Sequence, residues 1–170
     1  RSRLRARLVL AGLSACGLAA LAWASFVHPL PRLIYNPSDS VAVGWYRVDP
    51  LGHDTGSLPR PLSVGSIVLT RLPPDAATLA AQRGYLPARV PLLKRVGAVA
   101  PQEVCITGRI VRIDGVPSAA VLPADRWARP LPSWQQCRHL EPAELFLLSV
   151  TNPASFDSRS VGPVSTSAVI

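Results

Sequence analysis

Lys94 is the residue whose type and setting most directly suggest chemistry. It is the single lysine of the 170-residue chain, beside 17 arginines. Arginine keeps its proton near neutral pH, whereas a lysine can lose its proton when burial disfavours the charged form, and it can then act as a general base. Lys94 lies in an apolar run, PLLKRV at 91–96, that is typical of a strand. Two interpretations are open here: a buried base with a lowered pKa, or a surface lysine on a strand edge.

Two polar segments could supply a partner for such a base. In the first, YNPSDSVAVGWY at 35–46, Ser38 and Ser40 are two residues apart. In the second, SFDSRSVGP at 155–163, polar and charged side chains follow an apolar run that ends at Val150. A serine that attacks a peptide carbonyl needs a base to take its proton, and a neutral lysine can do this. Turn formation explains the first segment more simply, and a solvated loop with a salt bridge explains the second.

The rest of the chain must position these residues, and its pattern predicts a mainly β fold. The predicted strands are rich in Val, Ile and Leu and are bounded by Gly or Pro; they lie at 45–48, 66–70, 92–99, 104–107, 110–113 and 145–150. Gly108 marks a hairpin, and Asp114-Gly115 is a second turn signal. A short helix is predicted at 75–83, and long loops at 53–63 and 117–132. We therefore expect an antiparallel β-sheet domain with long loops and one short helix.

The N-terminus carries the pattern of a membrane anchor. Arginines at positions 1, 3, 5 and 7 precede 20 residues without a charge, at 8–27. As a helix, these residues would span about 30 Å, the thickness of the hydrocarbon core of a bilayer. The positive-inside rule then predicts a cytoplasmic basic stub at 1–7, one transmembrane helix at 8–27 and an exported domain at 28–170. A cleaved signal peptide, or a lipoprotein modified at Cys16 in the sequence LSAC, are the alternatives.

The four N-terminal arginines account for half of the net charge of +8. The region 28–170 has 14 basic and 10 acidic residues, so its own net charge is +4. The high net charge is therefore weak support for a nucleic-acid partner, and we expect none. The apolar content of 48% excludes an intrinsically disordered chain.

Cys105 and Cys137 are the two cysteines of the predicted exported domain. An oxidising compartment favours a disulfide between them over two free thiols, and the closed loop of about 30 residues would stabilise the fold by about 3 kcal/mol. No zinc site is expected, since the chain has no CxxC motif and its histidines, His28, His53 and His139, are scattered.

Taken together, these segments resemble the signal peptidase I superfamily of Ser/Lys peptidases, and most closely its conjugative-transfer TraF branch. That branch has a pattern like N-x-S-x-S-x-P-x-G-x-Y, to which 36–46 is similar, a motif like L-K-R-V, found at 93–96, and an ending like S-F-D-S-R-x-x-G-P, found at 155–163. The resemblance extends over 35–164. One departure is Ala42, which stands where the family has a proline after the nucleophile.

The resemblance implies roles for six residues of the site. Ser40 would be the nucleophile and Lys94 the general base, a Ser-Lys variant of the catalytic triad. The Ser38 hydroxyl and the backbone N–H of Ser40 would form the oxyanion hole. Supporting residues would be Ser155 and Asp157, which line the surroundings of the lysine, and Arg159, which would pair with Asp157. The branch also carries cysteines where Cys105 and Cys137 stand, which supports the disulfide.

The function that the resemblance implies is a membrane-anchored serine endopeptidase that cleaves exported precursors such as a propilin, with no cofactor and no metal. The chain would be a single-pass protein of the bacterial inner membrane with its catalytic domain in the periplasm. We expect an apolar face of this domain to contact the lipid bilayer, with Leu30, Leu33, Ile34, Val41 and Val43 as candidates.

Three alternatives differ in function. A housekeeping signal peptidase I is the nearest, and a non-catalytic envelope or pilus-assembly protein on the same fold is the second. A self-processing repressor-type protease is disfavoured, because the predicted anchor occupies the place of its DNA-binding domain.

Overall fold

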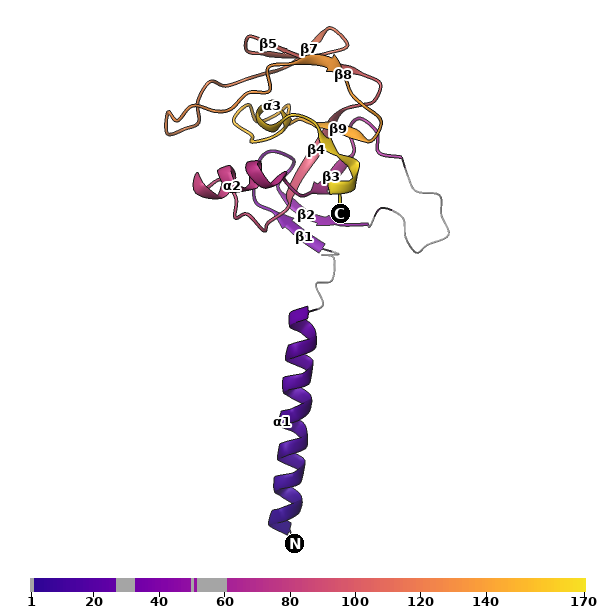
Figure 1. Ribbon diagram of the computed structural model, residues 1–170, viewed down its shortest axis with the longest axis vertical. Helices are drawn as coiled ribbons and strands as arrows, with labels where there is room; N and C mark the ends of the chain where they lie inside the picture. Colours follow the sequence, from indigo (N-terminus) through magenta and orange to yellow (C-terminus); the bar gives the residue numbers. More distant parts are fainter. Residues whose placement is uncertain (1, 27–32, 50, 52–60) are drawn as a thin grey trace. The chain divides into compact units, whose positions relative to one another are not determined.

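In the first unit of the chain, the described residues form one apolar helix. The computed structural model describes residues 2–26, 33–49, 51 and 61–170, and the chain divides into two units, Arg1–Pro31 and Arg32–Ile170. In the first unit, α1 (Ser2–Phe26) continues without a break through the arginines at 3, 5 and 7 (Figure 1). Its segment Arg3–Trp23 is long and apolar enough to cross a membrane, a criterion that a signal sequence also meets. The predicted basic stub and the predicted transmembrane segment thus belong to one helix over the described residues 2–26.

The described residues of the second unit form three antiparallel sheets (Figure 1). The first sheet is the pair β1 (Leu33–Asn36) and β2 (Gly44–Arg47). The second has the order β10 (Val164–Ser165), β9 (Glu144–Leu147), β4 (Leu92–Val99) and β3 (Ile67–Thr70). The third has the order β7 (Val116–Ala120), β6 (Ile110–Ile113), β5 (Glu103–Thr107) and β8 (Cys137–His139). The predicted mainly β fold with an N-terminal apolar helix is confirmed.

Within the described part of this unit, three short helical elements accompany the sheets: α2 (Pro74–Gln82), α3 (Ser158–Val161) and a 3₁₀ turn (Thr166–Ala168). The predicted helix at 75–83 corresponds to α2, which begins with Pro74 at its first turn, where a missing N–H is tolerated. One short helix was predicted, whereas the structure has a second, α3, inside the polar segment at 155–163.

Strands β4 and β9 separate two apolar cores. Side chains of a strand point alternately to its two faces. Phe146 and Leu148 accordingly pack into one core, whose other members include Val104 and Val111. Leu145 and Leu147 point to the opposite face and pack into the other core, with Val68, Val96 and Val164. Both faces are buried, which explains the continuous apolar run of β9. The backbones of the two strands approach closely at Gly97, where a Cβ would lie 2.7 Å from that of Leu148.

The best-predicted strands are those with strong apolar runs or turn signals. The predicted bounds of β4 and β6 are exact, and β5 and β6 form the hairpin expected at Gly108. Asp114 and Gly115 both have positive φ, 50° and 79°, in the turn to β7. β9 ends at Leu147, three residues before its predicted end.

Four of the described strands are not predicted by the sequence pattern. β1, β8 and β10 are short or polar, and β7 was wrongly assigned to the loop at 117–132. Pro117 lacks an N–H, which an edge strand such as β7 can accommodate. The predicted loop at 53–63 lies outside the described residues except for 61–63.

Candidate active site

The turn between β1 and β2 is organised around the side chain of Asn36. This amide is buried, and its Nδ2 donates to the carbonyl oxygens of Ser38, Val41 and Ala42 at 2.7, 3.1 and 3.1 Å. Its Oδ1 accepts from the backbone N–H and the hydroxyl of Ser38, at 3.2 and 2.8 Å. Short polar side chains commonly stabilise turns in this way. Asn36 therefore fixes the conformation of the turn that carries Ser40.

Ala42 is restrained although it replaces the proline of the family pattern. Its carbonyl oxygen accepts from Asn36 Nδ2 and, at 2.7 Å, from the hydroxyl of Tyr46 on β2. Two hydrogen bonds thus limit the freedom that the loss of the proline ring would give this turn.

Ser40, Lys94 and Ser155 lie together although they come from three separate parts of the chain. Lys94 Nζ lies 2.9 Å from Ser40 Oγ and 2.6 Å from Ser155 Oγ, and the two hydroxyl oxygens are 3.1 Å apart. Lys94 extends from β4, and Ser155 lies in the segment that follows β9. All three residues are buried, with at most 9% of their surface exposed. A hydroxyl beside a buried amine is the arrangement that a Ser-Lys mechanism needs.

Burial lowers the pKa of Lys94 from 10.5 to about 8. Desolvation of the ammonium group is the main cause, since the charged form loses its hydration in the interior. The negative charges of Asp157 and Asp39 act in the opposite direction, and the positive charge of Arg159 adds to the lowering. With a pKa near 8, about one molecule in ten has a neutral amine at pH 7. The interpretation of Lys94 as a surface lysine is therefore wrong.

A buried ion pair supports the segment that carries Ser155. Arg159 Nη2 and Asp157 Oδ2 are 2.8 Å apart, and both side chains are almost fully buried. The carboxylate also accepts from the backbone N–H of Arg159, where it caps α3, and from that of Ser149. Arg159 further donates to the carbonyl oxygens of Ala120, Asn152 and Ser155. The predicted pairing of Arg159 with Asp157 is confirmed, and the interpretation of 155–163 as a solvated loop is wrong.

Ser38 is turned toward Asn36, because its hydroxyl donates to Asn36 Oδ1 at 2.8 Å. The side chain is exposed. Ser38 would have to rotate about its Cα–Cβ bond to reach an oxyanion at Ser40, so its role in the oxyanion hole stays a prediction.

A groove of about 570 Å³ opens beside Ser40. Its lining is mostly apolar and comprises Asp39, Ser40, Val41, Ala42, Val43, Arg95, Leu148, Val150 and Thr151. Leu148 and Val150 belong to the predicted strand at 145–150, but the observed strand ends at Leu147, so these two residues line the groove from an irregular segment.

Exposed apolar side chains gather on the β1–β2 pair. Leu33, Tyr35 and Trp45 on these strands and Val43 in the turn are each more than half exposed. Of the predicted bilayer contacts, Leu33 and Val43 are exposed and Ile34 is half-buried. Val41 is 4% exposed, so this prediction was wrong: its side chain packs inward beside Ser40. Leu30 lies outside the described residues.

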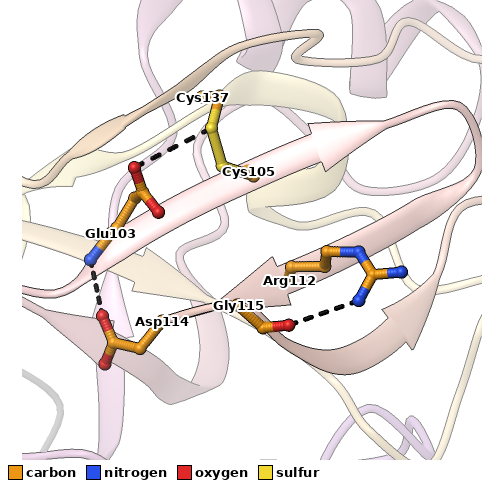
Figure 2. Close-up of a disulfide and its surroundings, with 6 residues drawn as sticks. All are labelled: Glu103, Cys105, Arg112, Asp114, Gly115 and Cys137. Atoms are coloured by element: carbon orange, nitrogen blue, oxygen red, sulfur yellow. Dashed lines mark hydrogen bonds between the residues drawn. A yellow bond between two sulfur atoms is a disulfide. The ribbon is translucent and has the colours of Figure 1, made fainter.

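The predicted disulfide between Cys105 and Cys137 is confirmed (Figure 2). It joins β5 to β8, whose residues pair directly at this point. Within the described part of the chain, Glu103, Cys105 and Cys137 are the one group of potential metal ligands whose ligand atoms lie within 4.8 Å of one another. The two sulfur atoms are bonded to each other, so only the Glu103 carboxylate is free to act as a ligand.

The comparison with protein families identifies the chain. Residues 5–170 match the family described as signal peptidase, peptidase S26. The chain belongs to this family. It is a peptidase of the signal-peptidase type, and its curated relatives place it in the TraF branch.

Two of these relatives are plasmid transfer proteins TraF of Escherichia coli. One is 30% identical over 98% of this chain and 91% of its own length. The other is 42% identical, over less than half of either chain (46% of each). A probable conjugal transfer protein TraF of Sinorhizobium fredii is 33% identical over 75% of this chain and 74% of its own length. A signal peptidase I from Enterococcus faecalis, with a solved crystal structure, is 17% identical over 66% of this chain and 96% of that chain, with a TM-score of 0.40.

Proposed function

We propose that this chain is a membrane-anchored serine endopeptidase that cleaves exported precursor proteins, with Ser40 as nucleophile and Lys94 as general base. The observation that carries the proposal is the buried Lys94 amine, 2.9 Å from Ser40 Oγ. A lysine with a pKa of about 8 is neutral in a useful fraction of molecules near neutral pH and can accept the proton of a hydroxyl.

The proposed reaction has two stages. The neutral amine of Lys94 accepts the proton of the Ser40 hydroxyl while Ser40 Oγ attacks the scissile carbonyl carbon. The resulting ammonium group then protonates the leaving amine, and an acyl-enzyme ester remains on Ser40. Water then gives a proton to Lys94 while its oxygen attacks the acyl carbon. The ester bond to Ser40 Oγ breaks, Lys94 returns the proton to Ser40 Oγ, and the acid product leaves. Ser155, 2.6 Å from Lys94 Nζ, holds the amine toward Ser40 throughout.

The tetrahedral intermediate needs donors for its oxyanion. We assign this role to the backbone N–H of Ser40 and to the Ser38 hydroxyl, which would exchange its bond with Asn36 for one with the oxyanion. One such donor contributes about 3 kcal/mol to stabilisation of the transition state.

The groove beside Ser40 supports an extended substrate with small apolar residues before the scissile bond. Val43, Leu148 and Val150 give it an apolar lining, and main-chain hydrogen bonds would supply affinity with little demand on sequence. Since the matched relatives are named for plasmid or conjugal transfer, we propose a propilin or a similar conjugation precursor as the substrate.

The proposed location is the bacterial inner membrane, with α1 as a single anchor and the catalytic domain in the periplasm. The arginines at 3, 5 and 7 favour a cytoplasmic N-terminus, and a disulfide favours an oxidising compartment. The exposed side chains of Leu33, Tyr35, Val43 and Trp45 would contact the bilayer, and no nucleic-acid partner is proposed.

The test is to express the full chain in bacterial membranes with propilin precursors encoded beside it, and to follow precursor mass. Wild type should shorten a precursor, while Ser40→Ala and Lys94→Ala should leave it intact. Lys94→Arg is the matched control for charge, because arginine keeps a cation at this position but cannot act as a base. Cleavage by Ser40→Ala at the wild-type rate would refute the proposed dyad.

A further inference from the structure

The turn that carries Ser40 has few hydrogen bonds to the rest of the domain. β1 and β2 pair with each other and with no other described strand. Among the described residues, only Ser40 and Asp39 of the 33–49 segment form hydrogen bonds with residues outside it. Those of Ser40 involve the reacting atoms themselves. The bonds of Asp39 are therefore the ones that can fix the turn while Ser40 reacts.

Asp39 is bound by two residues more than 110 positions away in the sequence. The hydroxyl of Thr151 donates to its carbonyl oxygen at 3.2 Å, and Asn152 Nδ2 donates to its Oδ1 at 2.5 Å. Asp39 lies directly before Ser40, so these bonds hold the backbone next to the nucleophile.

Asn152 in turn belongs to the segment that positions Ser155. Its Oδ1 accepts from the N–H of Ala154 at 2.8 Å, and its carbonyl oxygen accepts from Arg159 Nη2 at 2.9 Å and from the N–H of Ser155 at 3.2 Å. The buried Asp157–Arg159 pair thus fixes Asn152, and Asn152 fixes Asp39.

We propose that Asp39 and Asn152 are positioning residues that join the turn bearing Ser40 to the segment bearing Ser155. The inference rests on the proposed peptidase function. Its physical basis is that Ser40, Lys94 and Ser155 must keep distances of about 3 Å although they come from three segments. A displacement of 1 Å between reacting groups can lower a rate about a hundredfold.

The test uses the full chain in detergent and an internally quenched peptide with an Ala-x-Ala cleavage sequence. Asp39→Ala and Asn152→Asp should each lower kcat by about tenfold to a hundredfold, with a smaller change in KM. In Asn152→Asp the acceptor for Ala154 is kept, but a second carboxylate faces Asp39. The combination of Asp39→Asn with Asn152→Asp should recover most of kcat, because the amide and carboxylate can bond in the reverse direction.

Asp39→Asn alone separates position from charge. Its amide oxygen can still accept from Asn152, so its loss of kcat should be clearly smaller than that of Asp39→Ala. Because the Asp39 carboxylate raises the pKa of Lys94, its neutralisation should move the acidic limb of the kcat/KM profile to lower pH. Asp49→Asn is the matched control, since Asp49 is an exposed residue that binds Arg47 within the 33–49 segment. Neither kcat nor the pH profile should change in this control.

The inference would be overturned if Asp39→Ala and Asn152→Asp both kept the wild-type kcat, or if the combined variant did not recover kcat. It would also be overturned if thermal unfolding showed that a smaller folded fraction accounts for the loss of kcat. The proposed function is judged separately by Ser40→Ala. If Ser40→Ala is inactive while the Asp39 and Asn152 variants are normal, the positioning role is wrong and the peptidase proposal stands. If Ser40→Ala cleaves the peptide, the proposed function is wrong.

Discussion

At the scale of single residues, the burial of Lys94 sets the pH range in which Ser40 can be activated. Since the base must be neutral and its pKa is about 8, kcat/KM should rise about tenfold per pH unit below pH 8 and level off above it. The measurement is a pH–rate profile of the full chain with the Ala-x-Ala peptide. A profile that is flat between pH 6 and 9 would show that Lys94 is not the base.

The same shift has a consequence for stability. Between pH 8 and 10.5 the unfolded chain binds the Lys94 proton and the folded chain does not, so the free energy of unfolding rises with pH in this window. The rise from this group is about 3 kcal/mol. Lys94→Met lacks the group, so its stability relative to wild type should fall by about that amount from pH 8 to 10.5. Denaturant unfolding of both proteins in detergent measures the difference, and a difference independent of pH would contradict the shifted pKa.

The positions of Ser40, Lys94 and Ser155 could be named from motifs, but the contacts that hold them could not. Asn36 stands in the recognised pattern, and its place two residues before Ser38 is a signal for a turn. Its five hydrogen bonds depend on how the turn folds back around it. Thr151 and Asn152 carry no local signal, because their partner Asp39 is more than 110 residues away.

At the scale of elements, prediction succeeded where a strand is buried on both faces or ends in a marked turn. β4 has a long apolar run, and the turn from β6 to β7 has Asp114-Gly115. β8, with the sequence CRH, has no strand pattern of its own, and its pairing with β5 defines it as a strand. α3 has only four residues and depends on the cap from Asp157. Such elements exist through tertiary contacts, which the local sequence does not encode.

The Asp157–Arg159 pair should make a large contribution to the integrity of α3 and the Ser155 segment. Removal of one partner leaves an uncompensated buried charge, which typically costs about 3–5 kcal/mol. We expect Arg159→Met to lower the free energy of unfolding by about this amount and to lower activity with it. Arg47→Met is the matched control, because the Arg47–Asp49 pair is about 80% and 73% exposed. Its effect should stay below about 1 kcal/mol in the same denaturant titration, and equal effects of the two variants would contradict the role of burial.

At the scale of the whole molecule, the disulfide stabilises the sheet β7–β6–β5–β8 while the proposed catalytic side chains lie on other segments. Cys105 and Cys137 are 32 residues apart, and closure of such a loop lowers the entropy of the unfolded chain by the equivalent of about 3–4 kcal/mol. Cys105→Ser with Cys137→Ser should therefore lower stability by about 3–4 kcal/mol. Because the site keeps its contacts, kcat should remain near wild type at temperatures where the variant is folded. A loss of kcat without a loss of stability would contradict this separation.

The proposed topology depends on α1, whose apolar segment Arg3–Trp23 fits an anchor or a signal sequence equally by length and composition. An uncharged stretch of 20 residues exceeds the usual apolar core of a cleaved signal, about 7–15 residues, and we therefore predict that the helix is retained. The protein extracted from bacterial membranes should resist release by alkaline carbonate, and its mass should include α1 and no lipid on Cys16. A C-terminal alkaline phosphatase fusion should be active, because that reporter folds in the periplasm. Replacement of the arginines at 3, 5 and 7 by neutral residues should lower its activity, since the charge difference that orients the helix is then smaller. Release from the membrane in a shortened form would instead identify α1 as a cleaved signal.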